Sequence, residues 1–303
     1  MQSPMRWIRY FKPRTNAARK TLYGYLFILP FILGFFLWFV IPVTVSAWMA
    51  FQDWNIISPA RFVFLENFTT MFGDDLFWQS LKVTAIYSFV SVPLGMVLSF
   101  GLALLLNTRV RGMAVFRTLF YLPVLVPAVA NAVLWAWMLN TDFGLLNLLI
   151  RGLGFTKVRW LIDPKLALPS LIFVSLWSIG SSVVVFLAGL QGVPDVYYEA
   201  AEIDGAGRWT KLRHITIPLM SPVIFFSLIM GVIGSFQVFA AGYLITGGGP
   251  NNATLFYVMH IYRTGFTYLK MGQASALAWV LFLIILFFVT LIFKNFNRSV
   301  HYE

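Results

Sequence analysis

The sequence contains no cysteine, which excludes disulfides, thiol catalysis and zinc–thiolate sites. It has only three histidines, His214, His260 and His301, and their spacing does not match a metal-binding pattern. Charged residues are scarce as well, at 11% of 303 residues, whereas about 25% is usual in soluble domains. These absences remove most of the side chains that enzymes use for catalysis.

Apolar residues make up 59% of the chain, and its mean hydropathy is +0.80. A soluble domain cannot bury that much apolar surface, so the composition indicates a protein that crosses a membrane several times. Long apolar runs recur at the length of about 20 residues that a helix needs to cross the hydrocarbon. Backbone groups in lipid must be bonded within the segment, which makes each run a helix. The six predicted spans are residues 22–50, 83–106, 116–139, 167–190, 223–245 and 273–293.

The sequence therefore predicts an all-α integral membrane protein with a single domain, residues 1–303. The first run is too long for a signal peptide, so we expect it to be retained. Pro30 and Pro42 are expected to bend or end its helix. The stretch between the first two runs, residues 52–81, is long enough for a short amphipathic element on the outer face.

Lysines and arginines predict which side each end of the chain faces. The first 20 residues carry six bases and no acid, a mixture typical of a cytoplasmic membrane surface. With both ends inside, 14 bases fall in cytoplasmic segments and 8 in outer ones, so the bias favours N-in and C-in. The net charge of +11 is accordingly interpreted as contact with anionic lipid and not with nucleic acid.

One polar segment interrupts the apolar chain, and we call residues 191–218 the hook. Pro194 and Asp195 suit the start of a helix, because proline is tolerated in the first turn and acids favour the N-terminal end. Gly205 is expected to break that helix, and a second short helix is expected to end at Pro218. The charge bias places this helix-turn-helix in the cytoplasm. An amphipathic loop lying on the bilayer surface is the alternative.

The order of residues in the hook resembles the EAA motif of permease subunits of ATP-binding cassette (ABC) importers. Glu199-Ala200-Ala201 is followed by Gly205 and then by Ile215-Thr216-Ile217-Pro218, with the spacing of that motif. Ile217 stands where the family usually has leucine. The segment also lies between the fourth and fifth of six predicted spans, as it does in the family.

Further stretches resemble the MalF-like member of carbohydrate permease pairs. They are Thr246-Gly247-Gly248-Gly249-Pro250 with Ala253-Thr254 and Ile261-Tyr262, Trp160-Leu161-Ile162-Asp163-Pro164, and Gly189-Leu190 before Val193-Pro194. The glycine run lacks the Lys-Ser/Thr that would follow it in a phosphate-binding loop. The resemblance extends over residues 22–293.

This resemblance implies a MetI-like type I importer fold in a multi-pass protein of the bacterial cytoplasmic membrane. It implies a sugar or oligosaccharide substrate and a complex with a second homologous permease (a heterodimer), two ATPase subunits and an extracytoplasmic solute-binding protein. The chain itself has no Walker motif, so we expect it to be no enzyme and to bind no cofactor. ATP and magnesium would be held by the partner ATPase subunits.

By the same resemblance, the hook contacts the ATPase. Glu199 would pair with a base on the ATPase, the small residues would permit close docking, and Gly205 would shape the turn. The implied coupling residues are Glu199, Ala200, Ala201, Asp204, Gly205, Ile215 and Pro218.

Polar and small residues within the predicted spans are candidates for a solute pathway. Ser175, Ser178 and Ser182 recur at spacings of three and four and so share one helix face. The other candidates are Asn131 and Trp135 in the third span and Gly231, Gly234, Ser235 and Gln237 in the fifth. Small residues are also common where helices pack against each other in membranes. Helix packing therefore remains an alternative to sugar contact as the role of these residues.

Other function classes fit less well. A secondary transporter working alone would need an acid within a span to bind a coupling ion or relay protons, and every acid falls in a loop or near a span end. A membrane enzyme would need a catalytic cluster, which the sequence does not offer. Glycerol-3-phosphate or a related solute is the alternative cargo, although the spans lack bases to meet a phosphate.

Overall fold

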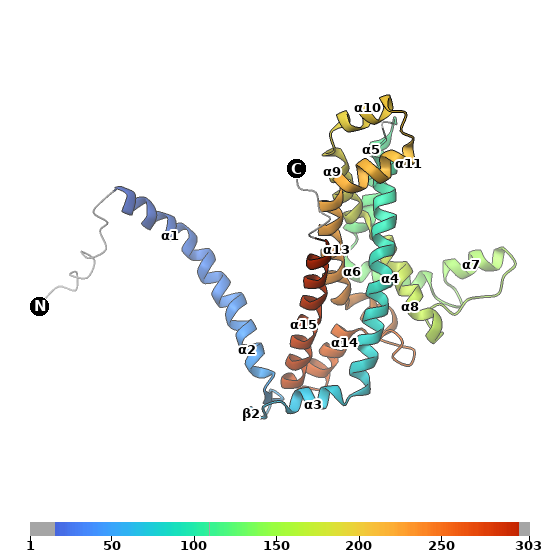
Figure 1. The fold of residues 1–303 in the computed structure, drawn as a ribbon. Coiled ribbons are helices and arrows are strands. Elements are labelled where there is room, and N and C mark those ends of the chain that lie inside the picture. The colour runs from blue at the N-terminus through green and yellow to red at the C-terminus, as the bar shows by residue number, and fades with distance from the viewer. Residues whose placement is uncertain (1–15, 109, 297–303) are drawn as a thin grey trace, which may run out of the picture.

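A computed structural model describes residues 16–108 and 110–296, and these residues are mainly helical (Figure 1). Several of the bases counted above, Arg6, Arg9, Lys12, Arg14, Arg109 and Arg298, lie outside the described residues, as does His301. The hook lies at one end of the helix bundle, and the turn after the first span lies at the other (Figure 1).

The first span consists of α1 (Asn16–Phe35), the π-helical turn η2 (Phe36–Val40) and α2 (Ile41–Met49). The helix continues past both Pro30 and Pro42, so of the two expected effects, bending or ending the helix, neither proline ends it. The Ile41 N–H bonds to the Phe36 carbonyl, five residues back, and this widened turn accommodates Pro42, which has no N–H to donate. The most apolar part of this span buries none of its residues, and it diverges from the bundle (Figure 1).

A small hairpin and a short helix follow the first span. Strand β1 (Gln52–Asp53) pairs antiparallel with β2 (Arg61–Phe62), and α3 (Glu66–Phe72) follows. The Asn67 side-chain amide donates to the carbonyls of Ala50 and Gln52, at 2.9 Å in both cases. The hairpin and α3 lie within residues 52–81, the stretch for which the sequence predicted a short amphipathic element.

Two long helices, α4 (Asp75–Leu106) and α15 (Met271–Phe296), form continuous spans. Helix α4 begins at Asp75 rather than at residue 83 because Asp74 caps it, its side chain accepting the Leu76 N–H at 2.8 Å. Carboxylates at the start of a helix are also stabilised by the positive N-terminal end of the helix dipole. The helix therefore extends beyond the apolar run.

Three further spans are bent pairs of helices. In the first pair, α5 (Met113–Tyr121) and η3 (Leu122–Leu125) are bent by 96° from α6 (Ala128–Met138). In the second pair, α8 (Pro164–Trp177) is bent by 47° from α9 (Gly180–Gln191). In the third pair, α11 (Arg208–Lys211), η4 (Leu212–Thr216) and α12 (Ile217–Leu219) are bent by 67° from α13 (Ser221–Phe236). Counting each pair once, the described residues contain up to six membrane spans. The predicted all-α, multi-span class is confirmed.

The fifth span ends earlier than predicted, at Phe236 instead of residue 245. Beyond it the chain turns back through η5 (Gly242–Thr246), α14 (Tyr257–Tyr262) and η6 (Arg263–Thr267). Gly242 lies so close to the Phe256 ring that a Cβ would collide with it. The apolar residues after Phe236 thus belong to a folded-back segment, which hydropathy does not distinguish from a continuing span.

The loop before α8 contains a further helix, α7 (Leu145–Gly152), which extends away from the bundle (Figure 1). Asn147 is buried and fixes this loop. Its side chain donates to the Val158 carbonyl at 2.8 Å and accepts the Val158 N–H at 2.9 Å.

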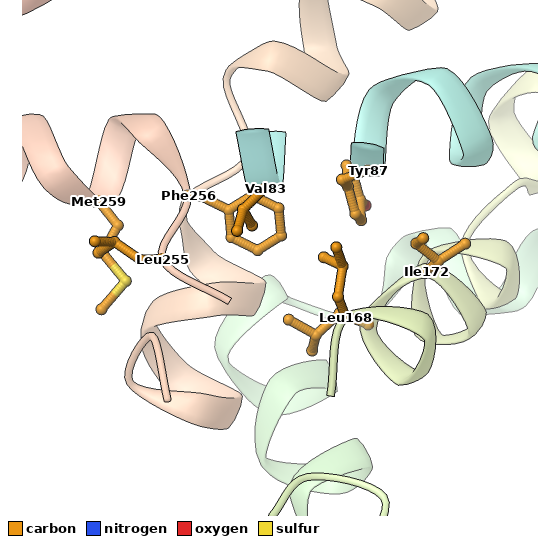
Figure 2. Close-up of a cluster of buried hydrophobic side chains, with 8 residues drawn as sticks. Val83, Tyr87, Leu168, Ile172, Leu255, Phe256 and Met259 are labelled. Carbon is orange, nitrogen blue, oxygen red and sulfur yellow. The ribbon is translucent and has the colours of Figure 1, made fainter. Parts of the chain in front are cut away.

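The core is a chain of apolar clusters along α4. In the cluster of Figure 2, Val83 and Tyr87 of α4 face Leu168 and Ile172 of α8, and the 255–259 segment closes the other side. The rings of Tyr87 and Phe256 meet edge to face at 5.0 Å. This packing holds α4 at the centre of the bundle, beside the candidate solute pathway.

Candidate functional site

The first limb of the hook is α10 (Asp195–Ile203), which begins after Pro194 as predicted. Gly205 ends it with a φ of +75°, a backbone angle that suits glycine. The Ala206 N–H bonds to the Ala201 carbonyl at 2.8 Å, and the Gly205 N–H bonds to the Glu202 carbonyl at 3.0 Å. These two bonds form the standard glycine cap of a helix C-terminus.

The second limb runs from Arg208 to Leu219 without a stop at Pro218, so the prediction that this proline ends it was wrong. The Ile217 N–H bonds to the Leu212 carbonyl, five residues back. As at Pro42, the wide π-helical turn before the proline accommodates its missing N–H. The break falls at Met220, where the chain bends into α13.

Side chains join the two limbs. The Lys211 ammonium donates to the Glu202 carboxylate at 2.6 Å, and this hydrogen bond holds the pKa of Glu202 below its ordinary value. Closer to the membrane end, the hydroxyls of Tyr198 and Thr216 lie 3.0 Å apart, with Thr216 buried. The hook is therefore a braced unit and not a flexible loop.

The hook exposes apolar side chains on its polar tip. Ile203 is 87% exposed and Trp209 is 74% exposed. Of the predicted coupling residues, Glu199, Ala200, Asp204 and Gly205 are exposed on the first limb and turn, while Ala201, Ile215 and Pro218 are half-buried. The ion pairs recorded among the described residues do not involve Glu199. Exposed apolar groups beside an unpaired acid are typical of a contact surface.

The base of the hook is packed into the ends of the spans. Met220 is fully buried in a cluster that includes Leu106 of α4 and Phe186 and Leu190 of α9. A Cβ on Gly189 would lie 2.9 Å from the Met220 methyl group, so this contact leaves no room for a larger residue. The base of the hook is therefore in direct contact with α9, next to the start of α13.

A cavity of about 440 Å³ lies between α4, α8, α9 and α13. Six of the nine predicted pathway residues line it, namely Ser175, Ser178, Ser182, Gly231, Gly234 and Ser235. The bend between α8 and α9 falls between Ser175 and Ser182, yet both still face the cavity. Among the described residues that line it, none is charged.

A second cavity, of about 310 Å³, adjoins the first and shares Tyr87, Ser175, Ser178 and Val238 with it. Asn131 lines this second cavity. Trp135 and Gln237 line neither cavity. Trp135 and Gln237 therefore lie apart from the other seven predicted pathway residues.

Each of these two residues has a different environment. Trp135 is buried, and its ring lies edge to face against Phe173 at 5.6 Å and Trp177 at 5.8 Å. Gln237 is exposed at the end of α13, because the helix stops there instead of continuing to residue 245. The shared helix face of Asn131 and Trp135 therefore does not put both side chains in one cavity.

Sequence reasoning missed four polar residues of the first cavity: Tyr87, Ser91, Ser181 and Ser227. A signal was present for three of them. Tyr87 and Ser91 are four residues apart in the second span and share a face. Ser227 likewise precedes Gly231 by four residues. Their convergence with α8 and α9 depends on the tertiary fold.

The described residues contain no group of three or more His, Asp or Glu side chains arranged to hold a metal. Outside the spans, His260 of α14 is buried, with its Nε2 3.7 Å from the Asp74 carboxylate. Burial lowers the pKa of His260, and Asp74 partly opposes that shift. This pair belongs to the end of the bundle opposite the hook.

Residues 91–302 match the family described as binding-protein-dependent transport system inner membrane component. The chain belongs to this family. The matched segment contains the hook and the cavity-lining helices α8, α9 and α13. The chain is thus a permease component of an ABC transporter and a multi-pass protein of the inner membrane.

Individual relatives match nearly the whole chain. The probable ABC transporter permease protein YesP of Bacillus subtilis is 40% identical over 297 residues, covering 96% of each chain. The trehalose/maltose transport system permease protein MalF of Thermococcus litoralis is 34% identical over 285 residues, covering 92% of this chain and 95% of that protein.

A solved structure has a similar fold. It is a chain of the bacterial alginate ABC transporter in complex with an alginate pentasaccharide-bound periplasmic protein. The TM-score is 0.82 at 25% sequence identity, with 92% of this chain and 96% of that chain covered. The MalF-like resemblance seen in the sequence is confirmed by these matches.

Proposed function

We propose that this chain is a membrane-spanning subunit of an importer for a neutral sugar or oligosaccharide. The observation that carries the proposal is the uncharged, hydroxyl-lined cavity of about 440 Å³ between α4, α8, α9 and α13. That volume lies within the range of about 300–1,000 Å³ that small-molecule sites occupy. The name of the Thermococcus permease, a trehalose/maltose transport protein, supports the same substrate class. The alginate transporter supports a saccharide cargo only in general, because alginate is an acidic polysaccharide.

The chemistry of the lining suits a sugar. Serine and tyrosine hydroxyls both donate and accept hydrogen bonds, as sugar hydroxyls do. Tyr87 lines both cavities. Glycerol-3-phosphate is the less favoured cargo, because the described lining contains no Lys or Arg to meet a phosphate.

We further propose that the complex contains a second homologous permease, two ATPase subunits and an extracytoplasmic solute-binding protein. The ATPase subunits would hold ATP and magnesium, and this chain would bind neither. The hook would insert into the ATPase through Ile203 and Trp209, with Glu199 meeting a base and the small Ala200 and Ala201 allowing close approach.

Energy would be transmitted through the buried joint at Met220. When the ATPase subunits close, the braced hook moves as one body and turns α9 and α13, which line the cavity. Such rigid-body switching opens a central site to one side of the membrane at a time. In this proposal the hook lies in the cytoplasm, with both chain ends on the same side of the membrane.

Filling the cavity tests the solute pathway. A Cβ on Gly234 has open space around it, so Gly234→Leu projects into the cavity without a clash. Gly101→Leu, on α4, also has open space at its Cβ and lies outside both cavity linings, which makes it the matched control. In the assembled complex, sugar uptake is expected to fall strongly with Gly234→Leu alone. Equal uptake by the two variants would overturn the assignment.

Purification tests the partners. The tagged chain, extracted gently from its host membrane, is expected to bring down an ATPase and a second permease. A chain that transports fully when purified alone would contradict the proposed complex and would favour a secondary transporter.

A further inference from the structure

At the end of the bundle opposite the hook, the structure contains a polar pocket of about 220 Å³, which we call the hairpin pocket. Its walls come from the β1–β2 hairpin, α3 and the start of α15. The residues that line it are Asp53, Trp54, Val63, Glu66, Asn67, Thr70, Lys270, Gly272 and Gln273. None of them belongs to the solute cavities or to the hook.

The backbone fixes the walls of the hairpin pocket. The Trp54 carbonyl accepts the N–H groups of Met271 and Gly272, at 2.9 and 3.3 Å. The Asn67 amide binds the hairpin from the other side. Gly272 approaches the Gln52 carbonyl so closely that any side chain would collide with it. The pocket is therefore preformed.

The charges of the pocket are of both signs. Asp53 and Glu66 contribute carboxylates, and Lys270 contributes an ammonium group. The ion pairs recorded among the described residues do not join these three side chains. Two carboxylates can accept the N–H groups of a primary ammonium, and a lysine serves as a point charge for a phosphate. The set therefore complements a small zwitterion that carries both groups.

The position of the pocket identifies the source of that zwitterion. The first span ends at Met49, and α15 begins at Met271, so the pocket lies at the membrane boundary of two spans. Trp54 lines it, and tryptophan is enriched at the level of lipid headgroups. We propose that the hairpin pocket binds the headgroup of a phosphatidylethanolamine molecule. Lys270 would meet the phosphate, and Asp53 and Glu66 would meet the primary amine.

Lipid retention by the complex containing the full chain tests this assignment. The complex in mild detergent is incubated with phosphatidylethanolamine, phosphatidylcholine or phosphatidylglycerol of identical acyl chains, and bound lipid is counted by native mass spectrometry. The ethanolamine lipid is expected to be retained about tenfold better than the choline lipid, whose methylated amine donates no hydrogen bond. Equal retention of these two lipids, or better retention of phosphatidylglycerol, would overturn the proposal.

Substitutions locate the site. Lys270→Gln and the double change Asp53→Asn with Glu66→Gln are each expected to abolish the preference, and they alter exposed side chains that do not hold the hairpin together. Lys165→Gln, an exposed lysine at the start of α8, is the control and should retain it. An unchanged preference in the pocket variants would contradict the assignment. Displacement of the lipid by an equimolar amount of soluble phosphorylethanolamine would show that the ligand is not a lipid.

Discussion

The Tyr198 hydroxyl lies 3.0 Å from the Thr216 hydroxyl and joins the first limb of the hook to the buried end of the second. Thr216 also donates to the Lys211 carbonyl at 3.4 Å. Removing the tyrosine hydroxyl leaves Thr216 with only this longer bond, which lies within its own limb. The limbs would then be joined at the Lys211–Glu202 pair near the tip, without the contact at the membrane end.

Tyr198→Phe is expected to weaken this joint by about 1 kcal/mol, the usual net worth of a hydrogen bond. Solute-stimulated ATP hydrolysis by the assembled complex should fall, while the subunits still copurify. Tyr197→Phe makes the same chemical change on an exposed neighbour and should leave the rate unaltered. Equal rates for both variants would show that the hydroxyl pair does not transmit the motion.

Gly205→Ala is expected to strain the turn of the hook. Its φ of +75° costs an alanine about 1–2 kcal/mol. Gly207→Ala is the matched control, because Gly207 has an ordinary φ of −70° and open space at its Cβ. Coupled ATP hydrolysis should fall in the first variant only. Similar losses in both would mean that the left-handed conformation is unimportant for docking.

Gly180→Ala is expected to disturb the contact between two bent spans. A Cβ on Gly180 would collide with the Phe120 carbonyl and would lie 2.9 Å from a Val124 methyl group. Such overpacking costs about 1–3 kcal/mol. Thermal unfolding should show lower stability than for Gly101→Ala, whose Cβ meets open space. Equal unfolding temperatures would indicate that the helices shift apart without cost.

The stability of the end of the bundle opposite the hook is expected to depend on pH through His260. Burial lowers its pKa in the folded state, so the unfolded state, with a pKa of 6.5, takes up the proton first. The stabilisation of the folded state by neutral His260 is therefore fully present above pH 6.5 and is lost as the pH falls below that value. Asp74 and Arg263 are the charged groups that act on it, in opposite directions.

Thermal unfolding from about pH 7.5 to about pH 5.5 measures this effect. His260→Gln should lower stability at the higher pH but should flatten the decline toward acid. His214→Gln, at an exposed histidine of the hook, should keep the wild-type slope. An unchanged slope in His260→Gln would assign the pH dependence to other groups.

The local shape of the hook was predictable because single residues determine it. Pro194 starts its first helix, and Gly205 ends that helix in the left-handed region. The effect of Pro218 was not predictable in the same way. A proline removes one N–H, and whether the helix breaks or widens by one residue depends on packing at Met220.

The spans followed from hydropathy, but their ends did not. Residues 237–245 are as apolar as a span, yet they fold back against Phe256 because Gly242 allows close approach. The serines of α8 and α9 were visible as a polar face. Their meeting with Tyr87 of α4 was not, because sequence spacing carries no information about which helices become neighbours.

The bonds that Trp54 and Asn67 make around the hairpin also have a mechanical meaning. The first span buries none of its most apolar residues, but its end at Met49 is fastened through the hairpin to the first turn of α15. This end of the span also contacts α15 directly, through α2. Whatever covers the exposed length of the span, lipid or another subunit, is therefore connected to the last helix of the bundle through α2 and the hairpin.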